Sequence, residues 1–218
     1  MPLQNRVDPF GDIEAVEWRG MFTGNRGVIH DPDTKTLLGR RWTTKAWIIC
    51  SCEYKGRRRE PMGRNARSGN AGWTELFFLD EVTALAAGHR PCFDCRREAA
   101  KDFVRRYGEA FGVAKPRVPE IDARLHVERL AFRRTPAALE AVDPAQLPDG
   151  AMIAIDGRAH ALKSGRQWPW SFRGYGAHVP VGVPGSAAIR LITPPTSIAV
   201  LKTGYKPVWH PTIQAEDR

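Results

Sequence analysis

The chain has 218 residues, of which 42% are hydrophobic and 26% are charged, and both shares are ordinary for a globular protein. It has no apolar run long enough to cross a bilayer, and its first residues show no secretory signal, so we expect no membrane partner and a cytoplasmic protein with reduced thiols. The net charge of +9 favours polyanionic partners, with nucleic acid first among them.

The positive charge is concentrated in the stretch that also contains all four cysteines. Between Arg40 and Arg106 there are 15 Lys or Arg residues and 8 Asp or Glu residues. Arginine dominates this stretch, and its planar donor fork suits phosphate oxygens. The alternative for any single pair is a solvated basic face without a ligand. The residues that we predict to contact phosphates are Arg57, Arg58, Arg59, Arg90, Arg96, Arg97 and Lys101.

Turn-rich sequence occupies residues 1–39, and the first predicted strand covers residues 42–54, where apolar residues and β-formers gather. Side chains two apart on a strand point to the same side, so this strand would present Cys50 and Cys52 together. Residues 55–72 are rich in Arg and Gly and have little to bury. They predict a long, exposed basic loop.

A second predicted strand over 73–79 leads into a short helix over 81–87. Asp80 is placed to cap this helix, and Gly88 stands where a helix usually ends. The sequence then predicts a tight knuckle at 91–95, which would turn two cysteine side chains inward.

Two longer helices are predicted after the knuckle. The first covers about 95–111, with a stripe of apolar residues at helical spacing and Asp94 placed as its cap. The second covers about 120–130. Thr135 followed by a proline predicts the start of a short further helix.

From Leu147 the sequence changes character. Hairpin turns at 148–150 and 156–157 flank short apolar runs, and an aromatic, glycine-rich segment follows at 168–176. The tail at 187–211 alternates strand-like runs with proline turns. This half therefore predicts a small sheet or barrel packed on the first half.

The predicted fold class is α+β, with a zinc-containing half followed by a mostly β half. We place a basic zinc-binding module at 1–113, with its core at about 46–111. A helical linker and a small β-rich domain follow at 117–218.

Cys50 and Cys52 form a C-x-C pair, and Cys92 and Cys95 form a C-x2-C pair. Zinc prefers four soft ligands in a tetrahedron, which a strand pair and a knuckle pair can supply, so we predict one Zn²⁺ ion on these four thiols. Buried free thiols and a C-x-x-C redox pair are the alternatives. His89 is among the substitutes if one cysteine is not a ligand.

The segment from Glu75 to Cys95 resembles the second half of the Ada-type metal-binding domain. The resemblance lies in an aromatic strand, an Ala-rich helix and an Arg-Pro-Cys-x-x-Cys knuckle. It implies zinc held by four cysteines, DNA binding and a setting in DNA repair, and by position it would make Cys50 a methyl acceptor. The C-x-C spacing, the longer basic connection between the pairs, and His89 depart from the family pattern.

A second group of residues suggests catalysis. His126, Glu128 and Arg129 are close in sequence, and in a nuclease they could serve as general base, metal-binding carboxylate and phosphate clamp. On a helix His126 and Arg129 share a face, whereas Glu128 points elsewhere. The alternative is an amphipathic helix whose polar groups are merely solvated.

Two further possibilities concern binding. Aromatic residues in 168–175, interleaved with Arg166 and Arg173, could form a stacking platform for unpaired bases, although such spacing is equally typical of a sheet core. The leading function hypothesis is zinc-stabilised nucleic-acid binding, probably of DNA. The competing hypotheses are an enzyme acting on nucleic acid and a module that docks an acidic protein.

Overall fold

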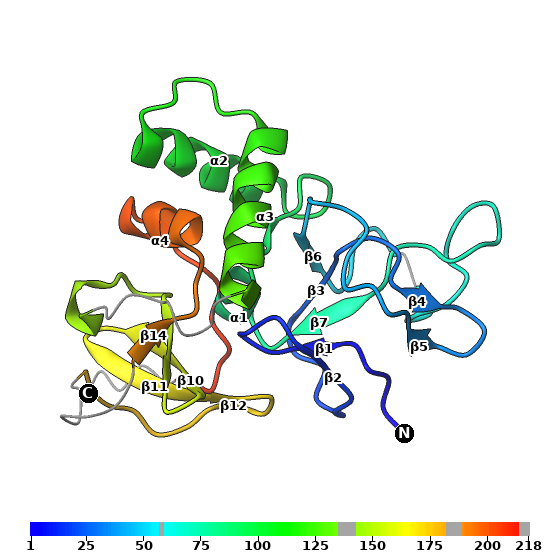
Figure 1. Cartoon of the computed structure of the whole chain (residues 1–218), viewed down its shortest axis with the longest axis horizontal. Coiled ribbons are helices and arrows are strands. Elements are labelled where there is room, and N and C mark those ends of the chain that lie inside the picture. Colours follow the sequence, from blue (N-terminus) through cyan, green and yellow to red (C-terminus); the bar gives the residue numbers. More distant parts are fainter. Residues whose placement is uncertain (57–58, 135–142, 182–188, 214–218) are drawn as a thin grey trace.

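The computed structural model describes residues 1–56, 59–134, 143–181 and 189–213 of the chain. The fold is α+β, which confirms the predicted class. Two sheets lie on opposite sides of a short central helix, and longer helices cover one end (Figure 1). In the described part of the chain, no helix is long and apolar enough to span a membrane.

The first sheet has the strand order β2-β1-β7-β3-β6-β8, and a separate hairpin, β4–β5, projects beyond it (Figure 1). These strands are β1 (Arg6–Val7), β2 (Ile13–Glu14), β3 (Phe22–Asn25), β4 (His30–Asp31), β5 (Thr36–Leu37), β6 (Ile48–Ser51), β7 (Leu76–Phe78) and β8 (Arg90–Pro91).

The pairing of β6 with β8 at the edge of this sheet is parallel. Ile48 lies opposite Arg90 and Ile49 opposite Pro91, and the Cys92 amide donates to the Ile49 carbonyl at 2.9 Å. A parallel register keeps the same ends of two strands together. Cys50, within β6, and Cys92, directly after β8, therefore lie side by side, as do the residues that precede the two strands.

The helix α1 (Glu81–Ala86) begins where the sequence predicts. The Asp80 carboxylate accepts from the Thr83 amide at 2.8 Å, which caps the first turn, and Gly88 follows the last turn with a φ of +80°. Every residue of α1 is buried. One side of the helix packs in the core of the first sheet, and the other packs against the second sheet.

Asp80 and Glu81 also hold the last part of the described chain. Asp80 accepts from the Tyr175 hydroxyl at 2.8 Å and the His210 amide at 3.0 Å. Glu81 accepts from the Tyr205 hydroxyl at 2.7 Å and the Val208 amide at 2.9 Å. Buried carboxylates require such donors, so the segment after α4 is fixed without any helix or strand of its own.

The second sheet has the order β12-β11-β10-β9-β14, with β13 also paired to β11. The turn at Asp156 and Gly157 joins β9 to β10, as predicted, and both residues have positive φ, at 49° and 76°. The strands are β9 (Met152–Ile155), β10 (Arg158–Lys163), β11 (Arg166–Ser171), β12 (Gly174–Tyr175), β13 (Val179–Pro180) and β14 (Ile189–Leu191).

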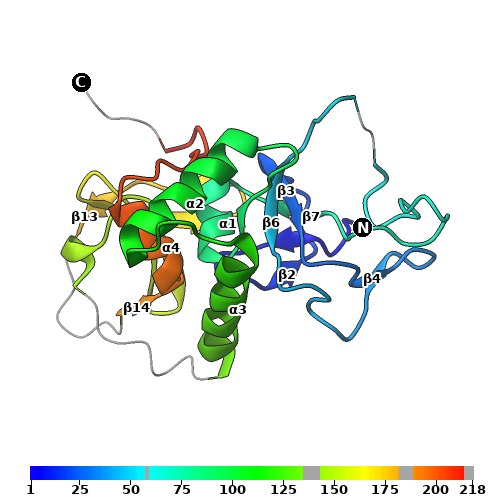
Figure 2. The ribbon, with the colours of Figure 1, turned by 90° about the horizontal axis from the view of Figure 1, so that it is seen from above.

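The remaining helices are α2 (Arg97–Phe111), α3 (Val118–Arg134), a 3-10 turn at Pro144–Gln146 and α4 (Pro195–Lys202). Seen from above, α2 and α4 lie on one side and α3 leads away from them (Figure 2). Val200 and Leu201 of α4 join the core of the first sheet. The C-terminal part thus contributes to the same core as the N-terminal part.

Three local predictions need correction or lie outside the described residues. The tail predicted as strand-like forms α4 between Pro195 and Lys202. Asp94 does not cap α2, because the N-cap position is Arg96, which makes no side-chain capping bond. The short helix predicted at Thr135 falls within residues 135–142, which the structure does not describe.

Candidate metal centre and basic surfaces

Three of the four cysteines form one group. The Sγ atoms of Cys50, Cys92 and Cys95 all lie within 4.8 Å of one another, and Cys50 and Cys92 are buried. Cys50 is in β6, and the other two flank the turn between β8 and α2. The parallel pairing of β6 with β8 brings the first two together, and the knuckle then returns Cys95 to the same place.

Backbone amides point at two of these sulfurs. The Asp94 amide lies 3.4 Å from the Cys92 Sγ, and the Ser51 amide lies 3.4 Å from the Cys95 Sγ. Hydrogen bonds from Cys50 and Cys95 lower the pKa of Cys92, and the same contact with Cys92 raises the pKa of Cys50. The pKa of Cys95 is also raised, so without a cation the contacts favour negative charge on the Cys92 sulfur alone, and a metal ion would be needed to hold all three sulfurs as thiolates.

The donor chemistry fits a soft or borderline cation. Two thiolates bound to one tetrahedral zinc, each at about 2.3 Å, have sulfurs about 3.8 Å apart, which is compatible with the observed cluster. Thiolate ligands select zinc, copper(I) or iron–sulfur clusters over magnesium or calcium. Three close cysteines can thus bind a metal ion.

Cys52 lies outside the group. Strand β6 ends at Ser51, so the two-residue alternation that would place Cys52 beside Cys50 does not continue. The Cys52 thiol instead donates to the Met21 carbonyl at 3.4 Å, and burial raises its pKa. The structure assembles a three-thiol set rather than the predicted four-thiol set.

Two arginines of the predicted phosphate surface are buried in ion pairs. Arg90 makes a two-pronged pair with Asp122 at 2.7 and 2.8 Å, which joins β8 to α3. Arg96 makes the same kind of pair with Glu81 at 2.9 and 2.8 Å. Because both guanidinium groups are committed to carboxylates inside the protein, these residues hold the knuckle against α1 and α3.

The other members of that predicted surface differ in exposure. Arg59 is partly buried, donates to Glu75 at 2.6 Å and lies 4.1 Å above the Trp73 ring. Arg97 and Lys101 are exposed on α2, and Lys101 pairs with Glu98 at 2.9 Å. Arg57 and Arg58 lie outside the described residues.

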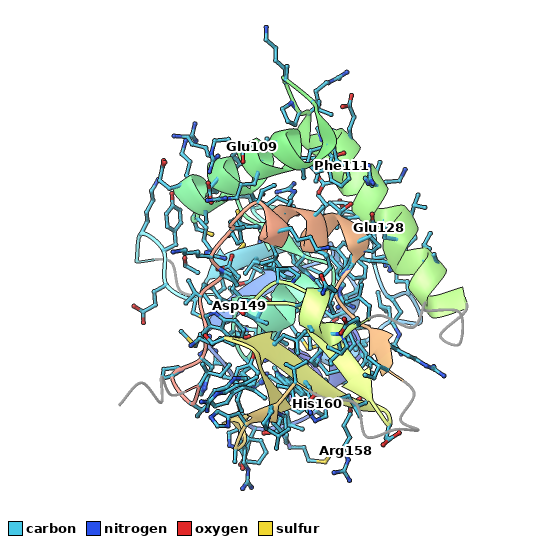
Figure 3. The ribbon with its side chains drawn as sticks, turned by 90° about the vertical axis from the view of Figure 1, so that its left-hand side faces the viewer. Glu109, Phe111, Glu128, Asp149, Arg158 and His160 are labelled. Atoms are coloured by element: carbon cyan, nitrogen blue, oxygen red, sulfur yellow. The ribbon has the colours of Figure 1, made fainter. Side chains whose placement is uncertain are left out.

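The residues suggested for catalysis separate as the helical spacing predicts. His126 contacts Trp42 and Arg129 contacts Trp47, both in the segment that leads into β6. The Glu128 carboxylate instead faces α4 (Figure 3), where it accepts from the Thr196 hydroxyl at 2.6 Å and amide at 3.1 Å. Glu128 therefore supports the start of α4. The three side chains do not converge on one point.

A buried cationic cluster, which we call the Trp47 cluster, is the feature that the sequence did not reveal. Arg26 and Arg129 place their guanidinium carbons 4.0 and 4.1 Å from the Trp47 ring centre. The His89 ring lies 5.0 Å from Trp47 and 3.3 Å from the Arg26 Nε. Burial, Arg26 and Arg129 hold the pKa of His89 well below its ordinary value, so this histidine is neutral.

The predicted aromatic platform is mainly core. Trp168 and Tyr175 are buried in the second sheet, and the Trp170 indole donates to the Thr83 hydroxyl at 2.9 Å. Phe172 packs edge-to-face on Trp170 at 4.8 Å. These side chains join the second sheet to α1, as aromatic side chains at two-residue spacing often do.

Comparison of this chain with protein-family models, with curated proteins and with solved structures finds no match. The assignment of function therefore depends on the three-thiol group and on the charged surfaces described above.

Proposed function

We propose that the protein is a zinc-stabilised nucleic-acid-binding protein, that DNA is its preferred ligand and that it acts in repair or processing, as the resemblance of residues 75–95 to an Ada-type domain implies. The observation that carries the proposal is the convergence of Cys50, Cys92 and Cys95 within 4.8 Å. A structural zinc ion fixes the segments that supply its ligands. Here these segments are β6, the knuckle and the residues that lead into α2.

The charge of the chain supports a polyanionic ligand. The net charge is +9, and several cations of the knuckle half, including Arg97 and Lys101, are exposed. Zinc would neutralise the mutual repulsion of the three thiolates, and the chain's own residues would supply all the phosphate contacts. Binding of this kind is mainly electrostatic, so the affinity should fall steeply with salt.

The first prediction tests the metal and its ligands. Purified protein should contain one zinc ion per chain, measured by elemental analysis, and Cys92→Ser should lose it because a hydroxyl is a much poorer zinc ligand than a thiolate. Cys52→Ser is the matched control: it removes a thiol of the same region, and we expect it to retain zinc. Loss of zinc in Cys52→Ser with retention in Cys92→Ser would contradict the three-thiol site.

Nucleic-acid binding is tested separately by fluorescence anisotropy with labelled single- and double-stranded DNA and RNA. We expect binding whose affinity falls by orders of magnitude between about 50 and 200 mM salt. A zinc-loaded protein with no affinity for any of the four ligands at low salt would refute the proposed function. Cleavage of a ligand that His126→Ala abolishes would favour an enzyme instead.

A further inference from the structure

A second basic surface lies at the far end of β6 from Cys50. The segment between β5 and β6 approaches α3 there (Figure 2), and the Arg129 guanidinium donates to the Lys45 carbonyl at 2.8 Å. In this segment Arg40, Arg41 and Lys45 are exposed, and the Trp42 side chain between them is 37% exposed. We call these four residues the Trp42 surface.

Few carboxylates neutralise the Trp42 surface. Among the residues that the structure describes, its only ion pair is between Arg41 and Asp12, at 3.9 Å. Neither Arg40 nor Lys45 has a carboxylate within ion-pairing distance in that part of the chain. Exposed cations without internal partners remain available to an external anion.

The layer beneath the surface adds positive charge. Arg129 is only 7% exposed, and its two terminal nitrogens are bonded to carbonyl oxygens, at Gly88 (2.6 Å) and Lys45 (2.8 Å), rather than to a carboxylate. The buried His126 Nδ1 and Arg129 Nε have no hydrogen-bond partner within the described ranges of the chain. Burial lowers the pKa of His126, and the charges of Arg129 and Lys45 lower it further. At His126, therefore, Arg129 and Lys45 contribute positive potential, although Asp122 and Glu128 also act on Arg129.

The Trp42 ring is available for stacking. Its ring contact is with His126, at 4.5 Å between centroids and 78° between planes. An edge-to-face contact of this kind occupies at most one face of the indole. An exposed aromatic face among cations is the arrangement by which proteins bind unpaired bases, because the ring stacks on a base while the cations contact the flanking phosphates.

We propose that the Trp42 surface binds single-stranded nucleic acid, with one unpaired base stacked on Trp42 and the adjacent phosphates on Arg40, Arg41 and Lys45. This inference rests on the proposed function and specifies its ligand. A duplex offers only phosphates to the same surface, since its bases are already stacked on one another. The surface should therefore distinguish single strands from duplexes.

Trp18 provides a matched control. Its side chain is 36% exposed, almost the same fraction as that of Trp42, but the Arg173 guanidinium lies 4.3 Å from its ring centre. The guanidinium covers one face of the Trp18 ring as a base would, whereas Trp42 is met only edge-to-face by His126, so we expect Trp18 to stack on a base less readily than Trp42. Substitution of either residue removes a half-exposed indole, and only the substitution of Trp42 should affect binding.

The test is an anisotropy titration of the full chain with a labelled oligothymidine of about 16 nucleotides and a duplex of the same length. Trp42→Ala should weaken single-strand binding by about tenfold and change duplex binding by less than about twofold. Trp42→Phe should restore most of the affinity, and Trp18→Ala should leave both affinities unchanged. Thermal unfolding of each variant verifies that it is folded.

A second measurement does not depend on the stability of the Trp42 variants. Arg40→Gln with Lys45→Gln should make the slope of log affinity against log salt shallower by about 1.4 for single strands, since each phosphate contact contributes about 0.7. Unchanged single-strand affinity in Trp42→Ala, or equal losses for single strand and duplex, would overturn the inference and leave the proposed function intact. Binding of polyglutamate in preference to all nucleic acids would overturn both.

Discussion

Arg96 and Arg129 are both nearly inaccessible to solvent, but their surroundings differ. Arg96 makes a two-pronged pair with Glu81, and that carboxylate is completed by a tyrosine hydroxyl and a backbone amide. Arg129 donates to two carbonyls and stacks on Trp47, and burial lowers its pKa to about 10. The charge of Arg96 is neutralised by a bonded carboxylate, whereas Arg129 is bonded to carbonyl oxygens and meets the charges of Asp122 and Glu128 only at longer range.

This difference shows which arginines of a basic sequence are free to act on a ligand. Burial of a charge costs free energy unless a partner compensates it, so a buried arginine with its own carboxylate is a structural element. A buried arginine that is bonded only to neutral carbonyl oxygens has no bonded carboxylate to neutralise it, so its positive charge acts on the groups around it. The Trp47 cluster and the Trp42 surface above it thus differ from the knuckle in how their arginines are compensated: the buried arginines of the knuckle have their own carboxylates, and Arg129 does not.

The largest expected loss of stability comes from breaking the buried ion pair between Arg96 and Glu81. Arg96→Ala removes one partner of a buried pair and leaves the Glu81 carboxylate without its cation, so the free energy of unfolding should fall by about 3–5 kcal/mol in urea denaturation. The adjacent, exposed Arg97→Ala is the control and should change stability by less than about 0.5 kcal/mol. Equal effects of the two substitutions would show that the Arg96 pair is not compensated as described.

A smaller loss of stability should follow from a substitution that places an extra atom against Arg129. Gly88 has a φ of +80°, and a Cβ there would lie 2.6 Å from the Arg129 Cδ. Gly88→Ala should therefore cost more than about 1 kcal/mol in thermal or urea unfolding, because the strain of the left-handed backbone adds to the displacement of Arg129.

Gly112→Ala separates these two contributions. Gly112 ends α2 with a φ of +65°, and a Cβ there would meet nothing within 4 Å. It therefore reports backbone strain alone. If Gly112→Ala lowers the free energy of unfolding as much as Gly88→Ala does, the close approach of Gly88 to Arg129 does not contribute to the loss.

The effect that is smallest near neutral pH is a pH dependence of the Trp47 cluster. The pKa of His89 is lowered in the folded protein, so below the ordinary histidine value of about 6.5 the unfolded chain binds a proton that the folded chain does not. Stability should fall as the pH decreases from 7.5, with a slope that approaches about 1.4 kcal/mol per pH unit for this residue. Urea midpoints measured across this range, in the wild type and in His89→Gln, test the effect. An unchanged slope in His89→Gln would assign it to other groups.

Local signals allowed part of the structure to be predicted. Asp80 and Gly88 fixed the ends of α1 because a capping side chain and a left-handed glycine act within one helical turn. The hairpin at Asp156 and Gly157 was predictable for the same reason. By contrast, α4 is buried on nearly all sides, so its apolar run lacks helical periodicity and resembles a strand, and Pro195 at its start looked like a turn.

The candidate metal site, too, was predictable only where local sequence spacing determines it. The C-x2-C spacing identified Cys92 and Cys95, but the position of Cys50 and the exclusion of Cys52 depend on where β6 ends and on its parallel pairing with β8. Whether an arginine is paired depends on long-range contacts of the same kind, since Arg90 meets Asp122 at 32 residues' distance along the chain. Composition gives the total charge, and only the fold decides which charges find partners.

The bonds that Asp80 and Glu81 accept from Tyr205, Val208 and His210 also set the order in which the molecule can be completed. The acids are synthesised well before their donors, and α1 lies between both sheets. During translation, Asp80 and Glu81 can bond early to Thr83 and Arg96, but they lack their donors from Tyr205, Val208 and His210 until that segment has left the ribosome. Completion of this hydrogen-bond network is therefore a later step than formation of the first sheet.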